Sequence, residues 1–145
     1  MSETGKAPFH LWIVGILTLL WNAIGAFDYT MTKLRNADYL SAFTPEQQAY
    51  FHGFPLWASA GWALGVWGAV LGSILLLARS RHAVTAFAAS LAGLAINSFY
   101  QFGLHYGDLE RLFGTFPMVF YAGVWIIAIA LFVYARRQAA AGVLR

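Results

Sequence analysis

Charged residues are confined to five short clusters, and the four stretches between them contain no Asp, Glu, Lys or Arg. These charge-free stretches are residues 7–27, 47–78, 82–107 and 112–135, and they contain 21, 32, 26 and 24 residues. An α-helix needs roughly 20 apolar residues to cross the hydrocarbon core of a bilayer. Each stretch is therefore long enough for one transmembrane helix, and the pattern predicts a chain that crosses a membrane four times.

The composition excludes most other classes of protein. Hydrophobic residues make up 60% of the 145 positions and charged residues 10%, against roughly 45–50% and about 25% in a soluble domain. A globule of this size cannot bury so much apolar surface. We therefore expect an all-α polytopic membrane protein with one domain over residues 1–145, and not a soluble enzyme, a nucleic-acid-binding module or a disordered chain. The absence of cysteine excludes disulfides, thiolate metal sites and iron–sulfur clusters.

The distribution of Lys and Arg orients the predicted helices. Six of them fall on the side that holds both termini and the connection between the second and third spans, and three fall on the other side: Lys6, Arg79, Arg81, Arg136, Arg137 and Arg145 against Lys33, Arg35 and Arg111. Because positively charged loops stay in the cytoplasm, both termini are expected there.

The first apolar stretch has a second interpretation, as a cleaved signal peptide. Lys6 precedes the apolar run, and residues 23–25 have the small-x-small pattern of a cleavage site. Trp21 and Asn22 just before that site, and Glu3 near the N-terminus, favour a retained helix instead.

Prolines and connection lengths place the ends of the predicted helices. Each of the four prolines stands near the start of a segment, where its missing N–H is harmless, and the spans are expected at about 9–29, 55–78, 81–102 and 116–135. The connection at 79–81 is so short that the second and third spans must be antiparallel neighbours. In the long first connection, Thr44, Pro45 and Gln47 are typical of a capping box. The prediction is an antiparallel four-helix bundle with a short external helix at Pro45–His52.

A stripe of small residues marks the second span. Gly61, Gly65, Gly68 and Gly72 follow one another at intervals of four, three and four residues, which places them on one helix face. Small residues let a second helix approach closely, and van der Waals contact of this kind is a principal source of helix association in lipid. We considered packing within the molecule first, a homodimer interface second and a smooth ligand path third.

The third span carries a polar stripe at Ser90, Gly93, Asn97 and Gln101, and His105 and Asp108 would continue it if the helix persisted. Buried amides need partners, and Asn22 of the first span lies at a comparable depth. One interpretation is therefore an interhelical hydrogen bond. The other is a small polar cavity for an uncharged polyhydroxyl solute, formed by neutral donors and acceptors beside aromatic rings at Asn22, Tyr29, Asn97, Ser98, Tyr100 and Gln101.

The ionisable residues give no sign of coupled ion movement, catalysis or a cofactor. Asp28 stands at the outer edge of the first span, where it could meet Lys33 or Arg35, or could serve as a gate at the mouth of a solute path. Charged residues occur only at the edges of the expected spans and not in their interiors, so a proton relay through the bilayer core has no visible members. A haem or metal site at His52, His105, Asp108 and Glu110 would follow no known spacing. We expect no catalytic residue, no metal and no cofactor.

Three segments of the chain resemble a known group of proteins. These segments are residues 21–29 (WNAIGAFDY), residues 63–73 (ALGVWGAVLGS) followed by 79–81 (RSR), and residues 100–104 (YQFGL). They are similar to a family of short bacterial inner-membrane proteins, largely from proteobacteria, that carry the label "sugar transporter". The resemblance extends from about Phe9 to Ala135 and implies a four-helix membrane protein that moves a sugar.

These observations predict a small-solute transporter, or a subunit of one, with sugars as the first candidates. Asn22, Asn97 and Gln101 are the expected solute contacts, with Tyr29 beside them and Asp28 at the mouth. The alternative is an accessory or assembly subunit that transports nothing and binds a partner membrane protein through its glycine face and external loop. The expected partners are the lipid bilayer and a second copy or another membrane protein, and no nucleic acid.

Overall fold

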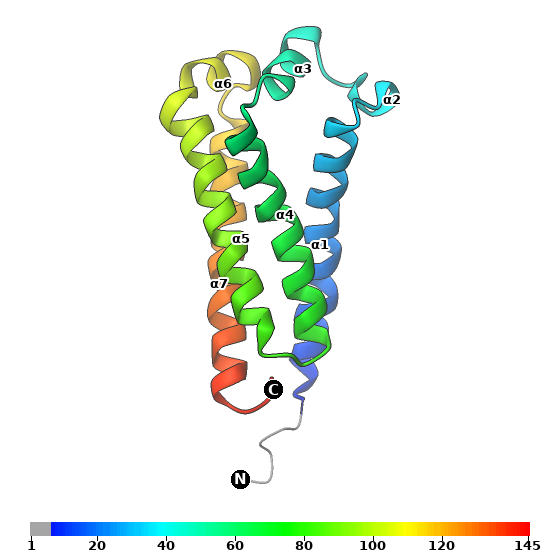
Figure 1. Ribbon diagram of the computed structural model, residues 1–145, viewed down its shortest axis with the longest axis vertical. Coiled ribbons are helices and arrows are strands. Elements are labelled where there is room, and N and C mark those ends of the chain that lie inside the picture. The colour runs from blue at the N-terminus through cyan, green and yellow to red at the C-terminus, as the bar shows by residue number, and fades with distance from the viewer. Residues whose placement is uncertain (1–6) are drawn as a thin grey trace.

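The computed structural model describes residues 7–145, and this part of the chain forms helices and connections but no strand (Figure 1). Glu3 and Lys6, used above for topology, lie outside the described residues. Four helical segments are long and apolar enough to cross a membrane: α1 (Phe9–Lys33), α4 (Leu56–Leu77), α5 (His82–Ser98) continued by the π-helix η1 (Phe99–Leu104), and α7 (Phe116–Ala140).

Three short helices gather at one end of the molecule, which we call the capped end: α2 (Ala37–Leu40), α3 (Pro45–His52) and α6 (Tyr106–Phe113) (Figure 1). The prediction of α3 is confirmed, with the capping box between Thr44 and Gln47 in place. Helices α2 and α6 were not predicted from the sequence. At the opposite end, the terminal end, α1 begins and α7 ends.

Three spans extend beyond their predicted ends. The first continues from 29 to Lys33, and the chain then turns at Arg35 with a φ of 55°. The fourth continues from 135 to Ala140, before Gly142 with a φ of 81°. The third reaches Leu104 instead of 102, because η1 prolongs it. The predicted ends followed the apolar runs, whereas the hydrogen bonding of a helix continues until the backbone leaves helical geometry.

The glycine stripe of α4 faces α5. A Cβ at Gly65 or Gly68 would meet the backbone of Leu94 at 3.4 Å or of Ser90 at 3.2 Å, and a Cβ at Gly72 would meet the ring of Phe87 at 2.6 Å. From the other side, a Cβ at Gly93 would lie 2.5 Å from the backbone of α4. Of the three interpretations of the stripe, the structure therefore shows packing within the molecule.

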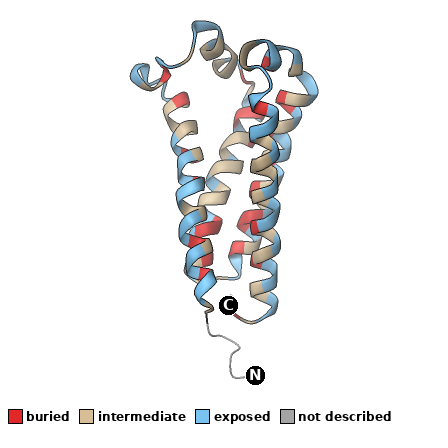
Figure 2. Ribbon diagram, turned by 180° about the vertical axis from the view of Figure 1, so that it is seen from behind, coloured by how far each residue is buried: buried red, intermediate tan, exposed pale blue. Residues whose placement is uncertain are grey.

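The four long helices pack in the order α1, α4, α5, α7, so α1 and α7 do not pack along each other. α5 packs along α4, α1 packs on the other flank of α4, and α7 packs on α5. A core at the terminal end holds all four together through the buried side chains of Leu11, Leu76, Phe87 and Leu131. Figure 2, which shows the molecule from behind, places α4 in the space between α1 and α7.

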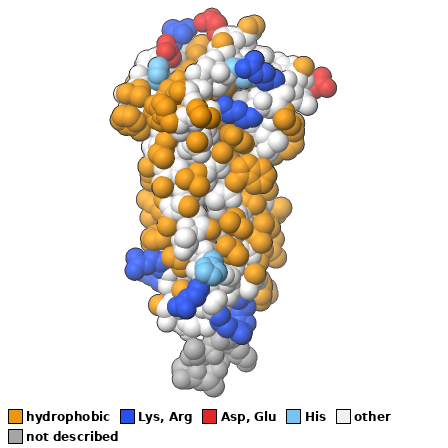
Figure 3. Space-filling model, viewed as in Figure 1, with side chains coloured by type: hydrophobic (Ala, Val, Ile, Leu, Met, Phe, Trp, Pro, Cys, Tyr) orange, Lys and Arg blue, Asp and Glu red, His pale blue; other side chains and the backbone are white. Residues whose placement is uncertain are grey.

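Charged side chains occupy the two ends of the molecule. On the face shown in Figure 3, hydrophobic side chains cover the middle, Lys and Arg gather at the terminal end, and both signs of charge occur at the capped end. The basic residues at the terminal end include Arg81, Arg136 and Arg137, whereas Glu46, Asp108 and Glu110 belong to the helices of the capped end. The apolar middle has the length and character that a bilayer requires.

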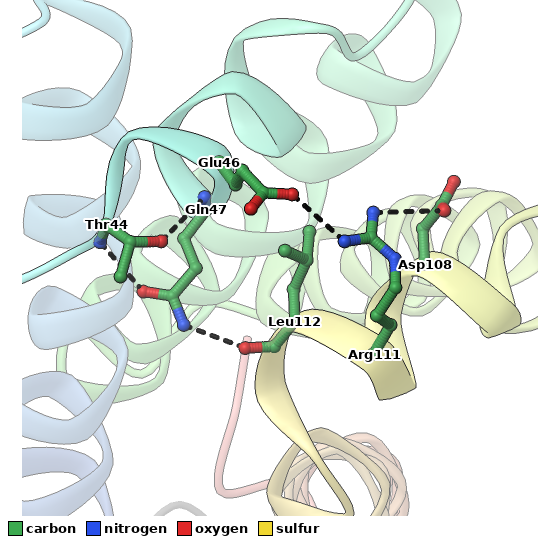
Figure 4. A network of polar contacts seen from close by, with 6 residues as sticks. All are labelled: Thr44, Glu46, Gln47, Asp108, Arg111 and Leu112. Carbon is green, nitrogen blue, oxygen red and sulfur yellow. Dashed lines mark hydrogen bonds and ion pairs between the residues drawn. The ribbon is translucent and has the colours of Figure 1, made fainter.

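A polar network joins two of the short helices at the capped end (Figure 4). Gln47 closes the capping box of α3 and donates from Nε2 to the carbonyl of Leu112 at 2.8 Å. Arg111 of α6 pairs with Glu46 of α3 at 3.0 Å and with Asp108 at 3.5 Å, and all three of these side chains are more than half exposed. Exposed ion pairs contribute little, so the half-buried hydrogen bond of Gln47 is the stronger link between α3 and α6.

Candidate functional site

A cavity of about 440 Å³ lies among the four long helices. It extends from Phe43 and Phe113 near the capped end to Phe87 and Leu131 of the terminal-end core. Ligand sites in proteins commonly have volumes of about 300–1,000 Å³. Most of the lining is aromatic or aliphatic, and its polar side chains are Asn22, Asp28, Tyr39, Ser90, Asn97, Gln101 and Tyr121.

Three of these polar side chains form a hydrogen-bonded group between α5, η1 and α7. Gln101 donates from Nε2 to Asn97 Oδ1 and to the Tyr121 hydroxyl, both at 2.6 Å. The Tyr121 hydroxyl donates to Asn97 Oδ1 at 2.9 Å. Asn97 and Gln101 are both buried, yet Asn97 Nδ2 has no hydrogen-bond partner. The group therefore leaves the Nδ2 donor of Asn97, a residue that lines the cavity, shut off from solvent and unsatisfied.

Asn22 lies elsewhere in the cavity and does not bond to Asn97 or Gln101, contrary to our interpretation of the polar stripe. Its Nδ2 donates to the carbonyl of Ala69 at 3.2 Å and to the Ser73 hydroxyl at 3.0 Å. Both partners belong to α4, which is the helix that α1 packs against. The partners of Asn22 therefore belong to α4, whereas those of Asn97 belong to η1 and α7.

Asp28 lines the cavity toward the capped end. Its partner is the hydroxyl of Tyr39 in α2, which donates a short hydrogen bond to Asp28 Oδ1. Asp28 is thus paired with Tyr39, and not with Lys33 or Arg35 as expected from the sequence. Lys33 instead donates to the Ser59 hydroxyl at 2.5 Å and lies over the rings of Phe54 and Trp62. Burial, followed by the hydrogen bond to Asp28, raises the pKa of Tyr39, so its hydroxyl stays protonated.

Two other expectations about the site are corrected. Tyr29 does not line the cavity; its ring packs edge-on against Trp62, with the ring centroids 4.9 Å apart. The polar stripe of the third span does not continue to His105 and Asp108, because η1 changes the helical register and His105 leaves the helix with a φ of −129°. Ser90, Gly93, Asn97 and Gln101 are all buried, as the stripe predicts.

Sequence reasoning missed Tyr121 and Tyr39, which complete the two polar groups of the cavity. Tyr121 stands in the most apolar of the four spans. The presence of its hydroxyl group inside that span was the one sequence signal that it contributes to a polar site. Tyr39 follows Asn36, whose side chain caps α2 by accepting from the Tyr39 N–H at 2.9 Å. An Asn cap three residues before a tyrosine indicates a turn, but it does not identify the carboxylate that the tyrosine reaches.

His52 of α3 is a titratable group in the part of the cap that covers α1. Its ring is hydrogen-bonded to the Thr32 backbone, and its Nε2 is shut off from solvent without a partner. Burial, with Arg35 nearby, lowers the pKa of His52. Among residues 7–145, no three His, Asp or Glu side chains come close enough together to hold a metal ion.

The lowered pKa predicts that the fold loses stability as the pH falls. Below about 6.5 the unfolded chain binds a proton at His52 that the folded chain resists, so the free energy of unfolding should decrease between about pH 7 and pH 5. Thermal unfolding in detergent micelles across this range would measure the slope. His52→Gln should flatten it, whereas His82→Gln, at an exposed position near the terminal end, should retain it. An identical slope in wild type and His52→Gln would contradict the prediction.

Comparison with known proteins adds no assignment, because no family model, curated protein or solved structure matches the chain.

Proposed function

We propose that the chain is a multi-pass protein of the bacterial inner membrane, inserted as a four-helix bundle with both termini in the cytoplasm. The support is the apolar middle of the molecule, the four helices long enough to cross a bilayer and the excess of Lys and Arg at the terminal end. In this orientation, the cap formed by α2, α3 and α6 lies outside the cytoplasm.

Within this membrane protein, the cavity binds a small neutral solute for transport. The observation that carries the proposal is the unsatisfied Asn97 Nδ2 on the wall of a ligand-sized cavity. Asn97 supplies the solute contact, and Gln101 and Tyr121 hold its amide in place. Asp28 and Tyr39 form the polar contact at the mouth. Sugars are the solutes that the family resemblance suggests.

Uptake into proteoliposomes tests this function. Wild-type protein should move a neutral solute from a panel that includes monosaccharides and neutral amphiphiles. Asn97→Ala should reduce the rate by about three- to tenfold, as expected for the loss of one hydrogen bond. Thr85→Ala, an exposed polar position on the same helix, is the matched control and should transport normally. Purified wild-type protein that moves no solute would sink the proposal.

The alternative of an accessory subunit keeps only one of its two predicted surfaces. Gly61, Gly65 and Gly68 face α5 within the same molecule, so a partner protein, or a second copy of the chain, could reach them only by displacing α5. The external cap remains available to a partner. Co-purification of a partner that depends on the cap, together with failed uptake, would favour this alternative.

A further inference from the structure

Among the side-chain amides that line the cavity, only Asn97 has a nitrogen without a hydrogen-bond partner. Gln101 Nε2 uses its donors on Asn97 and Tyr121, and Asn22 Nδ2 uses its donors on Ala69 and Ser73. Asn97 Nδ2 has no hydrogen-bond partner, although Asn97 is only 2% exposed. A buried N–H without a partner is unfavourable, so a ligand oxygen that accepts from Asn97 Nδ2 would relieve it.

The remaining walls suit an apolar body. Around the amide group stand aromatic and aliphatic side chains such as Val66, Leu94, Phe120 and Val124. A polyhydroxyl molecule would lose water from many hydroxyls here and regain few hydrogen bonds, which is costly. A ligand with one polar atom and an apolar remainder fits the donor and the walls together.

The capped end of the cavity is covered by packed rings. Phe51 contacts Phe43, Phe54 and Phe113, with ring centroids 5.7, 6.1 and 5.4 Å apart. These rings come from the α2–α3 connection, α3, the residues before α4, and α6, and all four line the cavity. They close the direct path from the aqueous surface above the cap.

The side between α1 and α7 is open by comparison. Besides the terminal-end core, these helices meet in a 2.6 Å hydrogen bond between His10 Nδ1 and the Tyr134 hydroxyl near the terminal end, and in the rings of Trp21 and Phe120, whose centroids are 6.2 Å apart. Beyond that ring contact, toward the capped end, Ile24 of α1 and Phe116 of α7 line the cavity and are 66% and 68% exposed. The cavity therefore reaches the outer surface of the molecule between these two helices.

We infer that the ligand is a membrane-dissolved amphiphile, with an apolar body and one neutral oxygen that accepts a hydrogen bond from Asn97 Nδ2, and that it passes sideways from the bilayer between α1 and α7. This inference rests on the proposed function and names its substrate class. In the proposed membrane, the opening beside Ile24 and Phe116 faces lipid chains. The solute therefore reaches the cavity without crossing the aromatic cap.

Equilibrium binding to the full chain in lipid nanodiscs tests the inference, with binding to empty nanodiscs subtracted. The probes are 2-dodecanone, which has one carbonyl acceptor, n-dodecane, which has none, and glucose. Wild-type protein should bind 2-dodecanone saturably, at about one molecule per chain and about three- to tenfold more tightly than dodecane. Glucose should not bind measurably.

Asn97→Leu should remove the preference for the ketone over the hydrocarbon, so that the two probes bind with equal affinity. Asn97 also accepts two hydrogen bonds, so Asn97→Leu could disturb the fold. Two further variants therefore test the cavity without changing Asn97. Gly25→Leu fills a place on the cavity wall where a Cβ meets only Val66, at 3.5 Å, and should weaken both apolar probes at least tenfold. Gly123→Leu, where a Cβ meets nothing within 4 Å and which does not line the cavity, should leave binding unchanged.

The outcomes separate the inference from the proposed function. Equal affinity of wild type for ketone and hydrocarbon, or ketone binding that Gly25→Leu does not weaken, would overturn the inference. Saturable glucose binding that depends on Asn97 would overturn it as well, but would leave solute transport standing. Ketone binding that behaves as expected, in a protein that moves no solute through a membrane, would support the inference and remove the transport function.

Discussion

Gly93→Ala should destabilise the fold by about 3 kcal/mol or more, a large effect for one added methyl group. The new Cβ would lie 2.5 Å from the Gly61 carbonyl oxygen and 2.5 Å from the Gly65 nitrogen. Both atoms belong to the backbone of α4, so neither can rotate away as a side chain would, and α4 and α5 must separate. Overpacking typically costs 1–3 kcal/mol and occasionally more, and the loss of close helix contact adds to it.

The matched control for this substitution is Gly123→Ala on α7, where a new Cβ meets nothing within 4 Å. Alanine is favoured over glycine in a helix by about 1 kcal/mol, so this variant should be neutral or slightly more stable than wild type. Unfolding of both variants by denaturant titration in micelles would measure the difference. Equal stabilities would show that α4 and α5 do not approach each other as closely as the structure describes.

Phe87→Ala should destabilise the fold by about 3–5 kcal/mol, the usual range for truncating a buried phenylalanine. The Phe87 side chain is 2% exposed and belongs to the terminal-end core with Leu11, Leu76 and Leu131, which come from the other three long helices. Phe99→Ala is the control on the same span, because Phe99 is 59% exposed and should lose far less. Similar losses at both positions would contradict the assignment of Phe87 to the core.

A double-mutant cycle with Gly72 sharpens this prediction. A Cβ at Gly72 would lie 2.6 Å from the Phe87 ring, so Gly72→Ala alone should be destabilising. In the Phe87→Ala background the ring is absent and the same methyl group fills part of the space, so its effect should become neutral or favourable. Contacting residues commonly show coupling of about 0.5–3 kcal/mol. A cycle with no coupling would mean that the ring does not cover Gly72.

The spans were predictable because charge is expensive in a bilayer. Asp, Glu, Lys and Arg are absent from four stretches of 21 to 32 residues, and each of the four long helices overlaps one of these stretches over most of its length. The antiparallel pairing of α4 and α5 followed from the three-residue connection. Helix α6 was not predicted because its charged residues Asp108, Glu110 and Arg111 are typical of a polar connection between spans. A polar segment can nevertheless form a short helix, as this one does.

The candidate site was only partly predictable, because sequence periodicity gives the face of a helix but not the neighbour of that face. Asn97 and Gln101 were recognised as buried polar groups from their spacing. Their partner Tyr121 depended on α7 packing against α5, and the separation of Asn22 from them depended on α1 packing against α4. Nothing in the apolar runs of α1 and α7 indicates which helix each adjoins.

The aromatic character of the cavity was also hidden in the sequence. Phe51 and Phe113 are 62 positions apart, and each reads as an ordinary apolar residue at the end of a polar connection. They meet because α3 and α6 fold over the same end of the long helices, with Gln47 bonded to the Leu112 carbonyl between them. Contacts between distant connections of this kind follow from the assembled structure and not from local pattern.

The π-helix η1 holds one residue more per turn than the helix that it prolongs, which gives the chain a place where a one-residue deletion would be absorbed. A deletion in an α-helical turn, with no wide turn to absorb it, would instead rotate the residues on either side of it relative to each other by about 100°. A deletion within η1 after Gln101 would leave its amide four residues from Asn97, whereas a deletion at Ser98, between them, would turn the two amides relative to each other by this angle. In a lineage of related chains, the position of a single gap would thus separate those that keep the amide pair from those that have lost it.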